Sequence, residues 1–346
     1  MGLFLLWLVL VGMTVWGTLA IYYSNLPVSV RPAAAAIFPL AAIAVGWFVR
    51  PLPWALLTFL AMFVVLTIWW LLIKPSNDRD WRPDVALLPY AEINGNQITA
   101  HNIRNCEYRT ETDFDLRYYD KTFNLDKLRT ADLFVVYWGL PVAHTMVSFG
   151  FDGGDYLCIS IEVRKEKAEE YSAIKGFFKQ YELIYIIGDE RDLVRLRTNY
   201  RPGEDAYLYR VKANPDLLRK VLLDYLESVN SLKQRPEWYN AVTKNCTTSI
   251  RGHYTRYTRS PWHWQYLLNG YLARLLYDEG TIDRSLPFDE LKKRSHINER
   301  AKAADKDPAF SERIREGLPG MLETGGWGLG AGGSRARLLD APPDPQ

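Results

Sequence analysis

The chain has 346 residues, of which 42 are basic and 40 are acidic, and these charges are distributed very unevenly. Only Arg31 and Arg50 are charged among the first 73 residues, whereas the rest of the chain carries 40 basic and 40 acidic side chains. This pattern excludes an ordinary soluble protein of one or two domains. The balanced charge of the polar part lacks the basic excess that non-specific nucleic-acid binding requires, so we do not expect nucleic acid as a partner.

Residues 1–74 are expected to form a membrane anchor with three transmembrane helices. Residues 3–22, 33–49 and 53–73 are apolar stretches, each close to the length that crosses a hydrocarbon core of ~30 Å at 1.5 Å per residue. A cleaved signal peptide is the alternative for the first stretch, but Met1-Gly2-Leu3 has no basic start and two further stretches follow. The few flanking basic residues do not orient the helices.

Residues 75–321 are long enough for one large domain with its own core, and residues 322–346, rich in Gly and Pro, are predicted to be a flexible tail. Short β-branched and aromatic segments predict strands in the first half of the domain, and apolar stripes of helical period predict helices in the second, so the fold class is α+β. The predicted strands are 133–138, 143–151, 156–163, 183–187 and 206–211, and helices are predicted to begin near 214 and 245 and to run through 264–277, 288–302 and 309–316.

Cys246 is the candidate nucleophile among the three cysteines Cys106, Cys158 and Cys246. An odd count allows at most one internal disulfide and leaves one thiol free. Asn245 is a plausible N-cap, which places Cys246 in the first turn of a helix, where backbone N–H groups and the helix dipole favour a thiolate and can hold an oxyanion. The alternative is a buried and inert cysteine.

A cysteine nucleophile needs a base, usually a histidine that the fold brings close. His253 follows Cys246 by seven residues and returns to the same helix face, but the axial rise of ~10.5 Å is too long for a direct pair. His253 is therefore predicted to lie on the helix surface, and His144 is the stronger candidate.

His144 lies in a predicted strand, and the pairing register with the next strand determines which residue lies opposite it. For both apolar faces to meet one core, even-numbered residues of 143–151 must pair with even-numbered residues of 156–163. A three-residue loop at 152–154 sets His144 opposite Glu162, which would orient the imidazole, whereas a loop shifted by one sets it opposite Arg164. The alternative is a half-exposed sheet face with ordinary polar residues.

Two further clusters are given structural or membrane interpretations. Asp189-Glu190-Arg191-Asp192 lacks a histidine or a second carboxylate group at ligand spacing, so a solvated turn or a structural ion pair is predicted rather than a metal site. A basic and aromatic stretch after Cys246 suits an anionic headgroup interface, with a plain amphipathic surface as the alternative; it comprises Arg251, Tyr254, Arg256, Tyr257, Arg259, Trp262 and Trp264. No phosphate loop, dinucleotide fingerprint, serine elbow or zinc spacing occurs, so no cofactor or metal is expected.

Several runs between residues 100 and 320 resemble, in order, the Lnb N-terminal periplasmic domain family. They include Ala143-His144-Thr145 to Phe151, Ile159-Ser160-Ile161-Glu162-Val163-Arg164, Glu182 to Tyr185, Asp189 to Leu193, Arg235 to Asn240, Asn245-Cys246-Thr247-Thr248 and Phe310 to Arg315. The resemblance implies a circularly permuted papain- or NlpC-like domain, an antiparallel sheet packed with helices, with Cys246 as nucleophile and His144 as base. Glu162 is expected to orient His144, and substrate or oxyanion contacts are expected from Asn245, Thr247, Ser160 and Arg164.

The function that the resemblance implies is cysteine acyl transfer in the bacterial cell envelope. An acyl chain would pass from a phospholipid, through a thioester on Cys246, to the N-terminal amine of a lipoprotein. The domain would then face the periplasm from a multi-pass anchor in the inner membrane. The alternatives are an NlpC-type cell-wall peptidase or amidase that uses the same pair of side chains, and a non-enzymatic envelope binding module in which Cys246 is merely buried.

Overall fold

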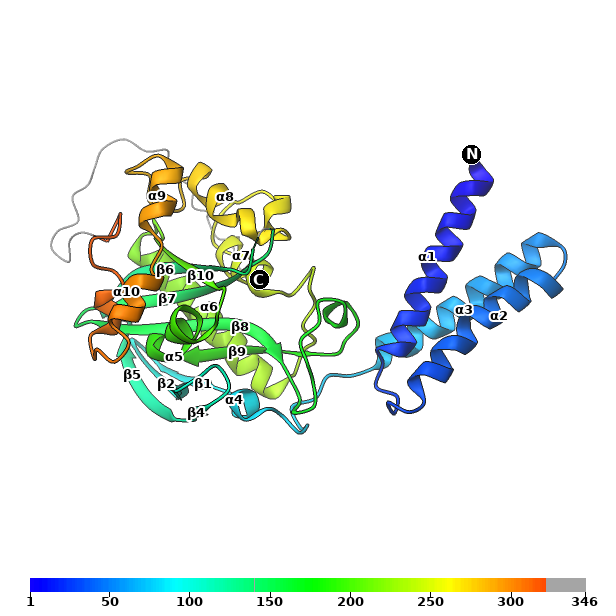
Figure 1. Ribbon diagram of the computed structural model, residues 1–346, viewed down its shortest axis with the longest axis horizontal. Helices are drawn as coiled ribbons and strands as arrows, with labels where there is room; N and C mark the ends of the chain where they lie inside the picture. Colours follow the sequence, from blue (N-terminus) through cyan, green and yellow to red (C-terminus); the bar gives the residue numbers. More distant parts are fainter. Residues whose placement is uncertain (140, 322–346) are drawn as a thin grey trace, which may run out of the picture. The chain divides into compact units, whose positions relative to one another are not determined.

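A computed structural model describes residues 1–139 and 141–321 (Figure 1), so the predicted tail at 322–346 lies outside the described residues. The chain divides into two compact units. The anchor unit comprises residues 1–79, 168–182 and 236–241, and the sheet domain comprises the rest of the described chain. Two short segments from within residues 75–321 thus belong to the same unit as the apolar helices.

The anchor unit contains three helices that are long and apolar enough to cross a membrane: α1 (Gly2–Tyr22), α2 (Arg31–Phe48) and α3 (Leu52–Leu72). They agree with the three predicted spans to within two residues at each end. Gly17 of α1 lies against the ring of Phe38 in α2, and a Cβ there would come within 2.6 Å of that ring. A glycine is therefore needed where α1 and α2 approach each other closely.

The sheet domain is built on an eight-stranded sheet with the order β1-β2-β9-β8-β7-β6-β10, and β5 pairs with β2 at the side. Its strands are β1 (Tyr90–Asn94), β2 (Gln97–Arg104), β5 (Tyr118–Asn124), β6 (Leu128–Tyr137), β7 (Ala143–Phe151), β8 (Asp155–Arg164), β9 (Glu182–Gly188) and β10 (Asp205–Arg210), and β3 (Glu107–Tyr108) with β4 (Phe114–Asp115) forms a separate ribbon. The α+β class is confirmed. The sheet is mixed, however, because β2 and β9 run parallel.

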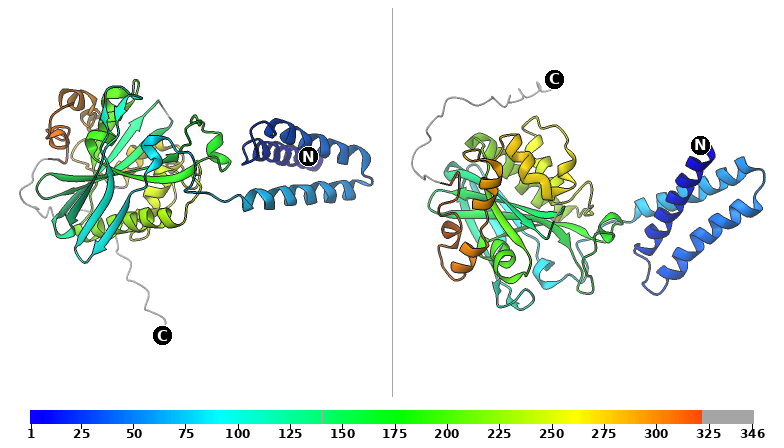
Figure 2. Two further views of the ribbon diagram at one scale, coloured as in Figure 1. Left: turned by 90° about the horizontal axis from the view of Figure 1, so that it is seen from below. Right: turned by 45° about the horizontal axis from the view of Figure 1, so that its top comes forward.

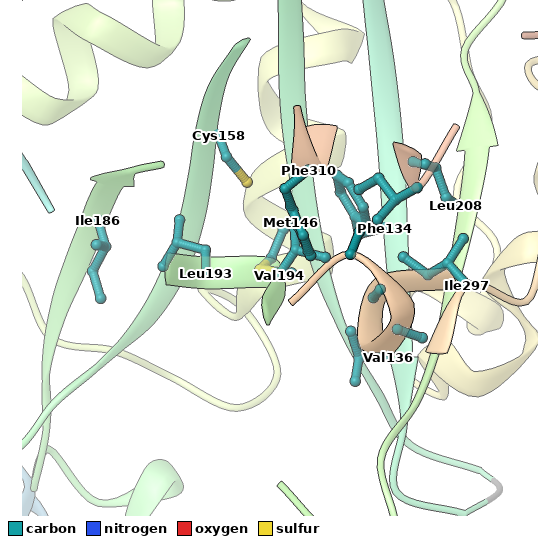
Figure 3. Packing of buried hydrophobic residues seen from close by; sticks show 14 of the residues in the cluster. Phe134, Val136, Met146, Cys158, Ile186, Leu193, Val194, Leu208, Ile297 and Phe310 are labelled. Carbon is teal, nitrogen blue, oxygen red and sulfur yellow. The ribbon is translucent and has the colours of Figure 1, made fainter. Parts of the chain in front are cut away.

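Helices cover both faces of this sheet. The side-chain contacts between strands and helices show which helices pack on each face. Figure 2 shows α6 (Pro215–Gln234), in yellow-green, along one face; α7 (Cys246–Thr255) and α8 (Leu272–Asp278) pack with it. The opposite face packs against α5 (Glu190–Arg195), α10 (Asn298–Ala303) and α11 (Phe310–Arg313). Figure 3 shows the core on that side, in which Met146 of β7 meets Leu193 and Phe310.

Both faces of β7 are therefore covered, and all nine of its residues are buried. The alternative of a half-exposed sheet face is wrong for this strand, because α5, α10 and α11 cover the side that carries His144. Successive strand residues point to opposite faces, so His144 and Met146 face the α5 side. Thr145 and Val147 face α6 and α7. The remaining helices are α4 (Pro83–Ala86) and α9 (Phe288–Arg294).

The acidic run at the start of α5 is a structural ion-pair cluster. Asp192 accepts two hydrogen bonds from Arg104, both of 2.9 Å, and Glu190 accepts from Arg315 at 2.7 and 2.8 Å. Arg315 also donates to Asp132 at 2.8 Å. These carboxylates are at most 1% exposed, so the predicted ion pair is present, while the predicted solvated turn is wrong because α11 and β2 bury this segment.

Candidate functional site

The hairpin of β7 and β8 has the register that places His144 opposite Glu162. Phe151 pairs with Asp155 and Met146 pairs with Ser160, which leaves residues 152–154 as the loop. Gly153 and Gly154 adopt φ of +91° and +82° there, a conformation that glycine accepts without steric cost. The three-residue loop predicted from the alternating pattern is confirmed.

Ser160 bridges His144 and Glu162 inside the domain. Its hydroxyl donates to Glu162 Oε1 at 2.7 Å and lies 2.9 Å from His144 Nε2, whereas Nε2 and Oε1 are 3.6 Å apart. A hydroxyl has one proton to give. Because that proton goes to Glu162, Ser160 Oγ accepts from the Nε2–H of His144. The neutral imidazole then carries its lone pair on Nδ1.

Burial and charged neighbours together set the protonation of His144 and Glu162. Burial, followed by the nearby Arg197, lowers the pKa of His144 to about 3, although Glu162 acts in the opposite direction. Burial works to raise the pKa of Glu162, but the Arg197 guanidinium, 3.1 Å away, outweighs it and holds that pKa well below its usual range. The site therefore contains a neutral imidazole and an ionised carboxylate at neutral pH.

Cys246 is the first residue of α7, as the sequence predicts. The Asn245 side chain accepts from Thr248 N at 2.8 Å, and Thr248 Oγ1 accepts from Asn245 N at 3.0 Å, so the two residues form a capping box. The Asn245 side chain is thus used in capping the helix. The N–H groups of Cys246 and Thr247 have no partner within the helix because of their position in its first turn, so they can hold an anion beside the sulfur.

Asn269 joins the cysteine helix to the histidine strand, and sequence reasoning missed it. Its Oδ1 accepts from Ala143 N at 2.7 Å, its Nδ2 donates to Thr247 Oγ1 at 2.8 Å, and Nδ2 lies 3.8 Å from Cys246 Sγ. The side chain is buried and lies in a 3-10 helix 22 residues beyond Thr247. No local pattern marks such an asparagine, because its partners come from two distant segments.

The structure does not bring the Cys246 thiol against the His144 imidazole. Thr145 Oγ1 lies 3.2 Å from Thr247 Oγ1, so α7 packs on the face that Thr145 shares, and His144 points to the other face of β7. No hydrogen bond joins the two side chains in the described parts of the chain. The elements of the predicted site thus form two clusters, with Cys246, Thr247 and Asn269 in one and His144, Ser160 and Glu162 in the other.

Arg164 lies outside both clusters. Its guanidinium donates to the carbonyls of Val85 and Ala86 at 2.9 and 2.7 Å and lies 4.2 Å from the centre of the Trp81 ring. The side chain is 2% exposed. Arg164 therefore supports the backbone of α4 in this structure.

His253 is buried, and its predicted position on the helix surface is wrong. Its Nδ1 lies 2.5 Å from Asp224 Oδ2 and its Nε2 lies 2.8 Å from the Tyr185 hydroxyl. The Tyr225 ring stacks on the imidazole with 3.8 Å between centroids. The packing of α6 beside α7 supplies these partners, and no periodicity within α7 alone could reveal them.

All three cysteines are free thiols, and their surroundings differ. Burial, followed by the Asp192 charge, raises the pKa of Cys106 to about 12, and burial holds the pKa of Cys158 well above its usual range. Such thiols stay protonated and are poor nucleophiles. Cys246, at a helix N-terminus, is the thiol whose position favours reaction.

Residues 115–270 match the family model of the Lnb N-terminal periplasmic domain. The match contains both clusters of the site and confirms the family resemblance that the motifs indicate. Together with the three apolar helices, it makes the chain a membrane protein with a periplasmic domain. No curated protein and no solved structure matches the chain.

Proposed function

We propose that this protein is a cysteine acyltransferase of the bacterial inner membrane. It transfers an acyl chain from a phospholipid to the N-terminal amine of a lipoprotein. The observation that carries the proposal is Cys246, a free thiol at the capped N-terminus of α7 within the segment that matches the Lnb domain family. A membrane anchor fits this reaction because donor and acceptor are both held in lipid.

The first half-reaction loads the enzyme. The Cys246 thiol gives its proton to a base, and the thiolate attacks the ester carbonyl of the phospholipid. The new C–S bond forms as the C–O bond breaks, and the lysophospholipid alkoxide leaves with the proton from the base. The N–H groups of Cys246 and Thr247 are suited to hold the oxyanion, and Asn269 Nδ2 is a third donor close to the sulfur.

The second half-reaction transfers the acyl chain to the lipoprotein. The α-amine attacks the thioester, a C–N bond forms and the C–S bond breaks. One amine proton passes through the base to the departing sulfur, which regenerates the thiol. The products are an amide and the free enzyme, so no oxidant, reductant or cofactor is consumed.

His144 is the proposed base. Its imidazole is neutral and carries a lone pair on Nδ1, as proton acceptance requires, and Ser160, Glu162 and Arg197 position it. In the resting arrangement it lies on the opposite face of β7 from Cys246. The mechanism therefore requires the start of β7 to rearrange when substrate binds, so that Nδ1 reaches the thiol and the imidazole leaves the buried surroundings that lower its pKa to about 3. A general base works best with a pKa near the operating pH.

The proposal is tested by mass spectrometry of a lipoprotein N-terminus from a strain that lacks its own N-acyltransferase. Expression of the wild-type chain should yield the N-acylated form, whereas Cys246→Ala and His144→Ala should lose it. Cys158→Ala is the matched control, because it removes another buried thiol, and it should retain N-acylation. Equal acylation by Cys246→Ala and wild type would refute the mechanism.

An envelope binding module is the rival that one observation favours, since Cys246 is only 7% exposed and no imidazole of the described residues makes a hydrogen bond with its sulfur. Iodoacetamide separates the two functions. A catalytic thiolate should react faster in the folded protein than in the chain unfolded by denaturant. Slower labelling of Cys246 in the folded protein would favour the binding module.

A further inference from the structure

An apolar cavity is lined by side chains of β6 and β7 and of the helices α6, α7 and α8. Its volume is about 90 Å³, several times the ~10–15 Å³ that one water molecule needs. Most of its walls are aliphatic or aromatic, and they include Leu133, Val147, Phe149, Val221, Ile250 and Leu276. An apolar cavity of this kind holds water poorly and binds apolar ligands instead.

The two charged residues that line the cavity, Arg251 and Glu279, interact with other side chains or backbone groups of the protein. Arg251 donates to Ser260 O at 2.8 Å, and its guanidinium lies 5.3 Å from the centre of the Trp262 ring. Glu279 lies 3.4 Å from His263 Nε2. Both charged side chains thus have a partner within the described part of the protein, although Arg251 Nε is buried without a hydrogen bond there.

The cavity reaches the neighbourhood of the proposed nucleophile. Thr247 forms part of its wall, and Thr247 Oγ1 lies 3.8 Å from Cys246 Sγ. Tyr225 also lines the cavity, and its pKa is raised by burial first and then by neighbours that include Cys246. A chain attached to the sulfur thus has an apolar space within reach.

Tyr225, which lines the cavity, has a buried polar atom without a hydrogen-bond partner among the described residues, as does Arg251 at its Nε. Tyr225 is 1% exposed, and its buried hydroxyl makes no hydrogen bond with any described residue. An unsatisfied buried hydroxyl is destabilising, so a ligand oxygen that accepts from it would be bound more tightly. A carbonyl next to an apolar chain meets both requirements.

We infer that this cavity binds the hydrocarbon chain of a fatty acyl group and that Tyr225 donates a hydrogen bond to its ester or thioester carbonyl. The inference rests on the proposed function, since it names the binding site for the acyl chain that Cys246 would carry. The chain fills the space between α6, α7 and α8. Tyr225 is a binding residue whose hydroxyl recognises an acyl group rather than a plain hydrocarbon.

The first test locates the chain without requiring turnover. The full-length Cys246→Ala protein is placed in lipid nanodiscs with a phospholipid whose acyl chain ends in a diazirine, and is then irradiated and digested for mass spectrometry. We expect crosslinks to Val221, Ile250 or Leu276. A parallel arm with the diazirine on free palmitate tells a phospholipid source from a free fatty acid.

Two variants and one control sharpen the result. Val221→Trp fills the cavity and should lower crosslinking at Ile250 and Leu276 at least fivefold. Lys220→Trp adds the same bulk at the exposed neighbouring position of α6 and should leave it unchanged. Tyr225→Phe keeps the packing and should remove the preference for an ester-linked over an ether-linked diazirine lipid, because the ether lacks the carbonyl.

The outcomes separate this inference from the proposed function. Crosslinks confined to α1, α2, α3 or the outer surface of the sheet domain would overturn the inference, even if N-acylation is observed. An equal ester preference in wild type and Tyr225→Phe would overturn the role of Tyr225. Cavity crosslinks in a protein that transfers no acyl chain would support the inference and refute the acyltransferase proposal.

Discussion

At the scale of single residues, a few buried polar side chains in the site each interact with several neighbours. The amide of Asn269 accepts from Ala143 N, donates to Thr247 Oγ1 and lies close to Cys246 Sγ. Ser160 similarly uses one hydroxyl to link His144 with Glu162. Because these groups are buried, changing one of them alters the charge or the tautomer of its neighbour rather than only removing a contact.

Replacing Asn269 with Asp should make Cys246 less reactive. The substitution keeps the size and the acceptor for Ala143 N but puts a negative charge within about 4 Å of the sulfur, which disfavours the thiolate. We expect iodoacetamide labelling of Cys246 at pH 7 to slow about tenfold, the change that ~1.4 kcal/mol produces. Asn298→Asp is the matched control, since Asn298 bridges Ala206 N and Glu204 O in the same way far from the thiol. Equal slowing in both variants would contradict a local effect on Cys246.

Burial of His144 should make stability depend on pH in a defined window. Its pKa is about 3 in the folded domain, compared with an ordinary value of 6.5. Between these two pH values the histidine is protonated in the unfolded chain but neutral in the folded domain. Stability should therefore fall as pH drops from about 6.5 toward 3, with a slope of up to about 1.4 kcal/mol per pH unit from this residue. Urea unfolding of wild type and His144→Gln across this range measures it. The two proteins should differ in slope only below pH 6.5, and identical slopes would contradict the shift.

At the scale of helices and strands, local signals predicted the elements but could not predict their partners. Alternation identified β6, β7 and β8, and the cap at Asn214 identified α6, because each signal is contained in a few consecutive residues. The strands β1, β2 and β5 were missed, since polar residues such as Glu92, Gln97 and Asp120 interrupt their apolar pattern. Their stability comes from pairing with one another.

The candidate site shows the same division. The positions of Cys246 in a helix start and of His144 opposite Glu162 follow from capping and register, and both could be predicted. The face of β7 on which α7 packs could not be predicted. It depends on the contact between Thr247 and Thr145, which are 102 residues apart in the sequence. For the same reason neither the partners of His253 nor the bridge through Asn269 could be predicted from local sequence patterns.

Arg315 should be the most sensitive position among the buried ion pairs. It neutralises Glu190 and Asp132 together, and all three side chains are buried. Arg315→Met fills a similar volume but leaves two buried carboxylates with less compensation, which should cost about 3–5 kcal/mol. Chemical denaturation of the detergent-solubilised protein measures the loss. Arg313→Met, at an exposed neighbour that pairs with Asp307, should cost far less, because solvent screens an exposed ion pair. Similar losses of stability in both variants would contradict the argument.

At the scale of the whole molecule, the anchor unit is more than three helices. Lys179 Nζ donates to the carbonyls of Trp70, Leu71 and Ile73 at 3.0, 3.0 and 3.3 Å. Trp238 Nε1 donates to Ile73 O at 3.1 Å, and Gln180 Nε2 donates to Tyr23 O at 2.7 Å. These donors reach carbonyls at the C-terminal ends of α3 and α1, where the last turn of a helix leaves carbonyls without the usual helical partner; Trp70 O also accepts from Ile73 N at 3.3 Å. The chain thus returns twice to the anchor unit after leaving it at residue 79.

Lys179 should hold the 168–182 segment on the end of α3. Its ammonium satisfies three carbonyls and lies 4.5 Å from the centre of the Trp70 ring, a favourable place for a cation because the helix C-terminus carries partial negative charge. In Lys179→Met these donors are lost, and residues 168–182 should exchange their amide hydrogens roughly tenfold faster in nanodiscs, the ratio that ~1.4 kcal/mol gives.

Lys175→Met is the control, because it removes a lysine from the same segment while leaving the Lys179 contacts in place. Exchange should then stay at the wild-type rate within this segment. Salt provides a second check, since screening weakens exposed charge pairs much more than a partly buried ammonium that donates to carbonyls. If the wild-type segment exchanged as fast as the Lys179→Met segment at any salt concentration, these hydrogen bonds would not be what keeps residues 168–182 with the apolar helices.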